Sequence, residues 1–179
     1  MRFEHQAIVL GLVLSSAVGV RAADRYVAQN GQTPASPYAG WATAASNIQD
    51  AVNAASANDT VWVADGTYAP PLLNAQVVSI TKGLALRGSS GNPAGVTIDG
   101  NGTNRGVYVN LTSPACVLIE GFTITNCQFV GAGAGVYLKH DGITAGTAVV
   151  QNCVITGNRA GINPERGYQL YGLNPLSGC

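Results

Sequence analysis

Val117-Leu118-Ile119-Glu120-Gly121-Phe122-Thr123-Ile124-Thr125 is the stretch that decides the fold, because it recurs 31 residues later as AVVQNCVIT, residues 148–156. Both copies are short runs of β-branched residues interrupted by a turn residue, which is typical of β-strands. Two further pairs of segments repeat: residues 84–88 fall on 117–121 with a shift of 33, and residues 106–109 fall on 135–138 with a shift of 29. An imperfect repeat of this length with several strands in each unit indicates a solenoid.

The composition of the repeat separates two kinds of solenoid. Helical repeats need paired segments with a period of 3.6 residues, whereas Thr, Val, Ile and Gly dominate here. We therefore predict an all-β chain in which residues 60–160 wind into about three coils of a parallel β-helix, with equivalent strands about 4.8 Å apart. Alternation along the strands predicts that Leu86, Ile119 and Val150 face the core, while Arg87, Glu120 and Gln151 face outward.

Turn residues fit the same interpretation. Glycines at 131, 133 and 135 predict a tight corner before Val136, where a side chain would clash or a positive φ is needed. Asn126 and Asn158 fall at strand ends, where their amides can satisfy backbone groups of the turns.

Residues 23–59 precede the coils and are expected to close their first end. We expect a strand over residues 26–28, a polar loop to Trp41, and a helix from Ser46 to Ala57 capped by a Ser46/Gln49 capping box. Asn58, after the helix, is expected to be left-handed. The helix has one apolar stripe, with which it would cover the exposed core and strand edges of the first coil. The stripe consists of Ile48, Ala51, Val52 and Ala55.

The first 22 residues read as a secretory signal, with Arg2 before a 14-residue apolar stretch (7–20) and small residues at Val20 and Ala22. We expect export to the periplasm, the outer cell surface or the medium, and no membrane-spanning segment once the signal is removed. The nine basic and nine acidic residues cancel. Without a basic run, nucleic acid is not an expected partner.

The four cysteines, Cys116, Cys127, Cys153 and Cys179, all lie in the second half of the chain. An oxidising compartment would permit disulfides, but the spacing defines no framework. We expect buried thiols or a single bridge. Close ligand pairs such as C-x-x-C are lacking, so we predict no metal and no cofactor.

The N-terminal segment resembles a known family. WATAASNIQDAV (41–52) followed by DTVWVADGTY (59–68) is similar to the entry segment of bacterial secreted right-handed parallel β-helix proteins of the pectate-lyase-like superfamily. Two later segments, GAGV (133–136) and ITGNRA (155–160), look like degenerate repeats of polymorphic outer-membrane autotransporters. The resemblance implies a right-handed coil. It implies no single activity, because the superfamily includes lyases, hydrolases, esterases and adhesins.

Candidate site residues are few. Arg87 and Glu120 should stack on adjacent coils, where a salt bridge is favoured over a catalytic role. Tyr108 and Tyr137 should stack in the 29-residue register as a cross-coil pair or as a platform for a sugar ring. The cluster Lys139-His140-Asp141 precedes Gly142, which favours a turn over a catalytic base. We assign no catalytic residue.

Residues 161–179 break the repeat, with Pro164, Pro175 and no alternation. We expect that the tail marks a truncation or frameshift of a longer chain; the alternative is an irregular cap. The leading hypothesis is a secreted or cell-surface module with a structural, adhesive or glycan-binding role, the partner being a polysaccharide or a cell-surface glycan. Its uncapped last coil would leave an edge that can pair with another copy. The alternative is the N-terminal part of a polysaccharide lyase or glycoside hydrolase with catalytic coils beyond residue 160.

Overall fold

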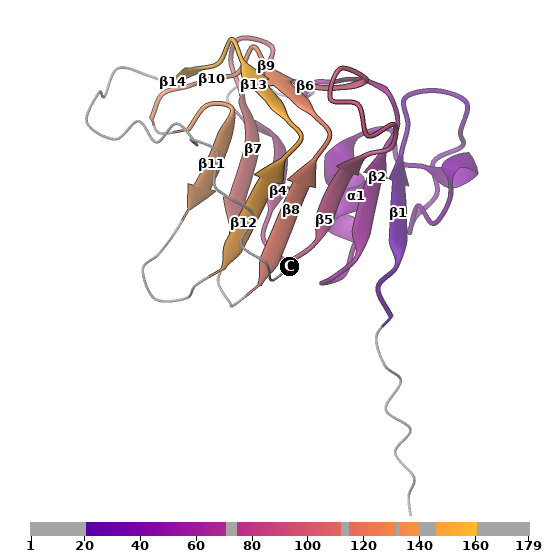
Figure 1. Ribbon diagram of the computed structural model, residues 1–179. Coiled ribbons are helices and arrows are strands. Elements are labelled where there is room, and N and C mark those ends of the chain that lie inside the picture. The colour runs from indigo at the N-terminus through magenta and orange to yellow at the C-terminus, as the bar shows by residue number, and fades with distance from the viewer. Residues whose placement is uncertain (1–20, 71–74, 112–114, 132, 140–145, 161–179) are drawn as a thin grey trace, which may run out of the picture.

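The computed structural model describes residues 21–70, 75–111, 115–131, 133–139 and 146–160 (Figure 1). In this part of the chain, short strands dominate and one α-helix, α1 (Ile48–Ala54), and one 3-10 turn, Trp41–Thr43, accompany them. The strands are β1 (Asp24–Val27), β2 (Thr60–Val63), β3 (Gly66–Tyr68), β4 (Gln76–Ile80), β5 (Ala85–Gly88), β6 (Val96–Asp99), β7 (Arg105–Asn110), β8 (Cys116–Glu120), β9 (Thr123–Thr125), β10 (Gln128–Phe129), β11 (Val136–Lys139), β12 (Thr147–Gln151), β13 (Val154–Thr156) and β14 (Arg159–Ala160).

These strands form four parallel sheets. The largest has the order β1-β2-β5-β8-β12 and faces the viewer in Figure 1. A four-stranded sheet has the order β13-β9-β6-β3, a three-stranded sheet the order β11-β7-β4, and β10 pairs with β14. From β2 to β9 the chain visits the five-, four- and three-stranded sheets in rotation, and each return adds a parallel neighbour to the strand laid down before. The predicted all-β, parallel-strand class is confirmed.

The three sequence registers are confirmed residue by residue. Val117 pairs with Ala148 and Thr123 with Val154, which is the predicted shift of 31. Arg87 pairs with Glu120, and Tyr108 pairs with Tyr137, as the shifts of 33 and 29 require.

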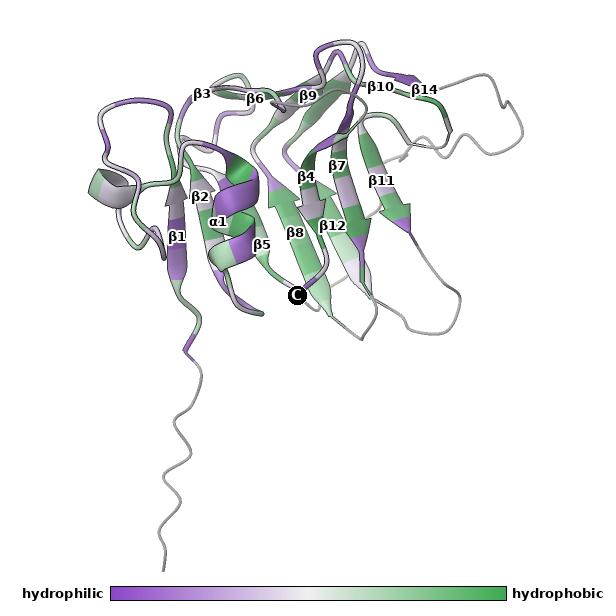
Figure 2. Ribbon diagram, turned by 180° about the vertical axis from the view of Figure 1, so that it is seen from behind, coloured by the Kyte–Doolittle hydropathy of each residue, from purple (hydrophilic) through white to green (hydrophobic). Residues whose placement is uncertain are grey.

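The core lies between the sheets and is built from stacked apolar residues. Leu86 and Ile119 are fully buried on neighbouring strands, as predicted, and Phe122 is fully buried beside them. Val150 is half-buried, because β12 is the last strand of its sheet and nothing in the described residues pairs with its outer edge. Figure 2 shows apolar residues along β4, β5, β8 and β12.

The corner glycines and Asn158 behave as expected, whereas Asn126 differs. Gly133 has a φ of +64°, and a Cβ on Gly135 would lie 2.8 Å from Asn158 Nδ2, so a side chain there would displace the asparagine. Asn158 accepts a hydrogen bond from the Cys127 backbone N–H at 2.9 Å and donates to the Ile124 carbonyl at 2.8 Å. Asn126 is left-handed, with a φ of +51°, and its Nδ2 donates to the Asp99 side chain, Oδ1, at 2.9 Å instead of to a backbone group.

The helix differs from the prediction at both ends. Its N-cap is Asn47, whose Oδ1 accepts a hydrogen bond from the Asp50 N–H at 2.9 Å, so the Ser46/Gln49 capping box is wrong. The helix ends at Ala54 rather than Ala57. The apolar stripe is confirmed, since Ile48, Ala51 and Val52 are buried.

Gln49 has a different partner, the free edge of β4. Its Oε1 accepts from the Ser79 N–H at 2.6 Å, and its Nε2 donates to the Ser79 carbonyl at 3.1 Å. The side-chain amide thus takes the place of a neighbouring strand at one edge of β4. The opposite edge of β4 is paired with β7. In Figure 2, α1 lies beside β4 in front of β2, so the helix seals this edge as the sequence predicts.

Candidate functional site

The outer face of the five-stranded sheet carries one row of side chains that crosses every strand. Tyr26 pairs with Trp62, Trp62 with Arg87, Arg87 with Glu120, and Glu120 with Gln151. We call these five residues the outer row. At about 4.8 Å between strands, it is roughly 19 Å long. Their inward neighbours Val61, Leu86 and Ile119 are fully buried, so the alternation of the strands fixes the row on the outside.

One end of the outer row is aromatic. The ring of Trp41, from the loop before α1, meets the ring of Tyr26 edge-on, with centroids 4.7 Å apart. Trp41 is 45% exposed. The indole of Trp62 is oriented by Asp24, whose Oδ1 accepts from Trp62 Nε1 at 3.1 Å. Such fixed, partly exposed rings offer flat apolar faces with polar edges.

The other end of the outer row is polar. Arg87 forms an ion pair with Glu120, and its guanidinium lies 5.9 Å from the centre of the Trp62 ring. Glu120 Oε1 also accepts from Gln151 Nε2 at 3.1 Å. The predicted Arg87–Glu120 pair is therefore confirmed. Arg87 and Glu120 remain 35% and 25% exposed, so both present polar atoms to solvent beside the aromatic rings.

The second pair of predicted residues lies on a different sheet. Tyr108 and Tyr137 stack across β7 and β11 with ring centroids 5.7 Å apart and an interplanar angle of 24°. The stacking is confirmed, but the tyrosines share their surroundings with Arg105. Its guanidinium lies 3.8 Å from the Phe129 ring centre, 4.6 Å from that of Tyr137 and 5.2 Å from that of Tyr108. We call these four residues the closed cluster.

Arg105 is held inside the closed cluster. It is 6% exposed, and its Nε donates to the Gly133 carbonyl at 2.8 Å. Burial lowers the pKa of the Arg105 guanidinium, and the neighbouring Tyr137 and Tyr108 oppose this shift. The tyrosine faces are therefore occupied by a cation of the protein itself. Beside the cluster, a hollow of about 250 Å³ is lined by Gly102, Thr103, Gln128, Phe129 and Val130.

Both states that the sequence allows for cysteine, the free thiol and the disulfide, occur among the described residues. Cys116 is disulfide-bonded, whereas Cys127 and Cys153 are free. Burial raises the pKa of the Cys127 thiol to about 12, and it also raises the pKa of the Cys153 thiol. Thiols shifted in this direction are protonated at neutral pH and are poor nucleophiles. No group of three or more His, Cys, Asp and Glu side chains that could hold a metal ion occurs within the described ranges.

Thus the structure brings Arg87 together with Glu120 and Tyr108 together with Tyr137, but it places the two pairs on different sheets. The sequence reasoning missed Tyr26, Trp41 and Trp62. The first two pairings of the outer row span 36 and 25 residues, from Tyr26 to Trp62 and from Trp62 to Arg87, outside the 29–33 repeat. The alternation in TVWV (60–63) could have revealed Trp62, since the side chains of Val61 and Val63 point to the core and that of Trp62 points to the outer face.

Several expectations fall outside the described residues. They concern the export signal up to residue 20, His140 and Asp141, and the tail 161–179. Lys139 is described and lies exposed at the end of β11, paired with Asn110.

Comparisons with known proteins give no relatives: no family model matches the chain, and no curated protein or solved structure does. Among the described residues, no helix has the length and apolar character needed to cross a membrane.

Proposed function

We propose that the chain is an exported module with a right-handed parallel β-helix fold, and that the outer row binds an extended, uncharged polysaccharide. The rotation of the chain through three sheets supports the coil. So does the parallel pairing of residues about one repeat apart. The same features support the resemblance to the pectate-lyase-like superfamily, which belongs to this proposal.

The continuous outer row is the observation that carries the binding function. Sugar rings combine an apolar face with hydroxyl groups around the edge. A surface that matches them needs aromatic faces next to hydrogen-bonding groups, and the outer row has both. Tyr26 and Trp62 supply the rings, and Trp41 adds a third ring beside the row, where it packs against Tyr26. Arg87, Glu120 and Gln151 supply donors and acceptors.

The regular spacing favours a polymer over a single sugar. Each strand contributes one side chain of the outer row, so the contacts lie along a line perpendicular to the strands. A line of about 19 Å is too long for one monosaccharide, and it suits several consecutive units of an extended chain.

The charges of this face favour an uncharged polymer. Arg87 is paired with Glu120, and Asp24 adds a further negative charge next to Trp62. A polyuronate would therefore meet a paired arginine and two carboxylates, which disfavours its approach. Hydroxyl groups of a neutral glycan can hydrogen-bond to all three side chains without a charge penalty.

Affinity measurements on the mature chain test the proposal. The panel contains neutral polysaccharides (xylan, glucomannan, a mixed-linkage glucan) and acidic ones (polygalacturonate, alginate). We expect binding to at least one neutral polymer and weaker binding to the acidic ones. Trp62→Ala should weaken binding tenfold or more, because truncation of a central aromatic residue costs about 2 kcal/mol at an interface.

Tyr137→Ala is the matched control, since it removes an aromatic ring of similar size from a different sheet. It should leave the affinity unchanged. Failure of the folded wild-type chain to bind any neutral polymer would contradict the proposal, as would loss of binding in Tyr137→Ala with retention in Trp62→Ala.

A further inference from the structure

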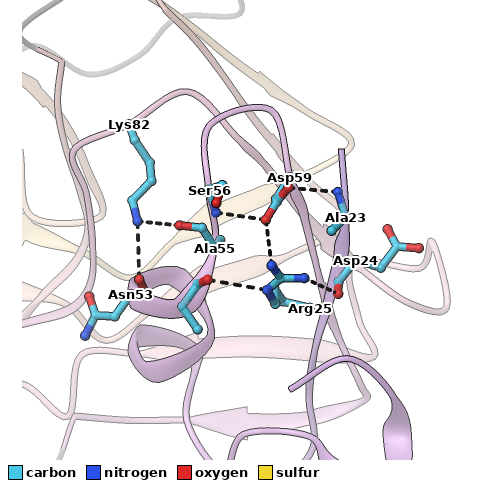
Figure 3. Close-up of polar contacts among 9 residues, drawn as sticks. Ala23, Asp24, Arg25, Asn53, Ala55, Ser56, Asp59 and Lys82 are labelled. Carbon is cyan, nitrogen blue, oxygen red and sulfur yellow. Dashed lines mark hydrogen bonds and ion pairs between the residues drawn. The ribbon is translucent and has the colours of Figure 1, made fainter. Parts of the chain in front are cut away.

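Asp59 is a buried carboxylate where the turn after α1, the start of β1 and the start of β2 meet. It is 1% exposed and directly precedes β2. Its Oδ2 accepts from the Ser56 N–H at 2.8 Å and lies 3.1 Å from an Nη of Arg25. Its Oδ1 accepts from the backbone nitrogen of Ala23 at 2.8 Å (Figure 3). The carboxylate thus ties the turn after α1 to the start of β1.

Arg25 is shared among several acceptors. Besides the ion pair with Asp59, its Nε lies 3.4 Å from the Ala54 carbonyl and Nη1 donates to the Asp24 carbonyl at 3.0 Å. Lys82 binds the other carbonyls at the end of α1, Asn53 and Ala55 (Figure 3). Oδ1 of Asp59 points to the nitrogen of Ala23. Of the cations labelled in Figure 3, none is joined to this oxygen.

The position of Ala23 coincides with the end of the expected export signal. The segment Val20-Arg21-Ala22 has the small residues at the first and third positions that a signal peptidase requires. Arg21 and Ala22 are exposed and precede β1, whereas Ala23 is half-buried and its carbonyl accepts from the Thr60 N–H at 3.0 Å. Among the described residues, which start at Arg21, the backbone contacts to the rest of the fold therefore begin at the residue that processing would expose.

We infer that the chain is cleaved between Ala22 and Ala23 and that Asp59 is the binding site for the new N-terminus. In this step a signal peptidase hydrolyses the amide bond. The hydroxyl of water goes to the Ala22 carbonyl carbon, a proton goes to the Ala23 nitrogen, and the amine takes a second proton from solvent at neutral pH. The neutral N–H···Oδ1 hydrogen bond becomes an ion pair between the α-ammonium and the Asp59 carboxylate. The inference rests on the export that forms part of the proposed function.

An ion pair at this place has a defined pH dependence. Asp59 is the partner of the α-ammonium, and three more charged groups lie in its surroundings. They are Asp24 and Arg25 on β1, and Lys82, which binds the carbonyls at the C-terminal end of α1. Charge-assisted hydrogen bonding to a buried carboxylate favours the protonated amine, so the folded state should raise the α-amino pKa above its ordinary range of about 7.7–8.0. The stabilisation is then fully present below that range and is lost as the pH rises through the raised value.

Two experiments test the inference. Expression of the full chain in a secreting host, followed by mass spectrometry of the exported protein, should give Ala23 as the first residue. The chain 23–179 is then compared with the same chain acetylated at Ala23. The free amine should give the higher melting temperature at pH 6, and the difference should disappear at high pH.

Controls separate the ion pair from other effects. Asp59→Asn should abolish the difference between the free and acetylated chains. Asp59→Asn also breaks the ion pair with Arg25, so this variant can fail to fold. The α-amino pKa of the wild-type chain is therefore measured directly by NMR titration.

An exported protein that starts at another residue would overturn the inference. So would equal melting temperatures of the two chains at pH 6, or an α-amino pKa within or below the ordinary range. These results are independent of glycan binding, which takes place on the outer face. A chain that binds a glycan without an ordered N-terminus fails only here, and a chain with the ion pair but no glycan affinity fails only the proposed function.

Discussion

The outer row and the closed cluster both place an arginine beside aromatic rings. They differ in how much of the arginine is exposed to solvent. Arg105 is 6% exposed and lies among Tyr108, Phe129 and Tyr137. Arg87 is 35% exposed at one side of Trp62 and is paired with Glu120. The rings of both groups are partly exposed, so the difference lies in the cation. Arg105 lies over the rings of the closed cluster from inside the protein, 3.8–5.2 Å from their centres, whereas Arg87 lies 5.9 Å from the Trp62 ring and is itself open to solvent. Stacked aromatic residues are therefore expected to bind a ligand only where a buried cation of the protein does not already lie over their faces.

The largest expected effect is on the closed cluster. Arg105→Leu removes a desolvated cation from three rings and leaves the Gly133 carbonyl without its Arg105 donor. We expect the free energy of unfolding to fall by about 3 kcal/mol, from the lost cation–π contacts and the charged hydrogen bond together. Urea denaturation measures it. A loss below about 1 kcal/mol would show that the cluster is no more important for stability than an exposed pair.

Alkaline pH tests how tightly the interior beside the closed cluster is packed. Burial raises the pKa of Cys127 to about 12, above its ordinary value near 9. The folded state keeps the proton that the unfolded state loses, so stability is present below pH 9 and declines as the pH rises toward 12. By pH 10.5 the loss is on the order of 2 kcal/mol.

Cys127→Ala should reduce this alkaline decline, as measured by denaturation at pH 8 and pH 10.5. It should not abolish the decline, because burial also raises the pKa of Tyr68 to about 12, with a contribution from Asp65, and the Tyr68 share is lost above pH 10. The same pH dependence in wild type and variant would mean that the Cys127 thiol is open to solvent.

The stacked tyrosines should be coupled by a smaller amount. A double-mutant cycle with Tyr108→Leu and Tyr137→Leu is expected to give an interaction energy of about 1 kcal/mol, as for other aromatic pairs. Additive effects of the two substitutions would contradict the stacked geometry.

The smallest effect on stability is expected in the outer row. Arg87→Gln breaks an ion pair in which both partners are partly exposed, so it should cost less than about 1 kcal/mol, and this small cost should shrink further at high salt. The same substitution should weaken glycan binding, since it replaces the long guanidinium and its five N–H donors with a shorter amide that has two. A large loss of stability would place Arg87 in the same class as Arg105 and remove the contrast.

The sequence predicted the pairing well where the repeat was regular. Arg87 meets Glu120 and Tyr108 meets Tyr137 because a fixed spacing and alternation along a strand leave no freedom in register. The pairing of the first strands was not predicted because their spacing differs from the repeat. Trp62 could not be placed beside Arg87, or Tyr26 beside Trp62, from the repeat alone.

The helix cap and the burial of Arg105 were not predicted, for two different reasons. The segment SNIQD (46–50) holds two overlapping cap motifs, and the edge of β4 decides between them by binding the Gln49 amide. Arg105 follows Asn104 and precedes Gly106, which reads as a polar turn. Its burial depends on rings from three separate strands, which no local pattern records.

Trp62 of the outer row and Trp41, which packs against Tyr26 at its end, give the most direct test of the proposed surface. Both indole N–H groups can be followed by NMR in the intact chain while a neutral oligosaccharide, taken from a polysaccharide that binds, is added. We predict that the signals of Trp41 and Trp62 shift in proportion to binding, while the ring signals of Tyr108 and Tyr137 stay in place. Binding that shifts the tyrosine signals and leaves both indoles unchanged would contradict the assignment of the glycan to the outer row.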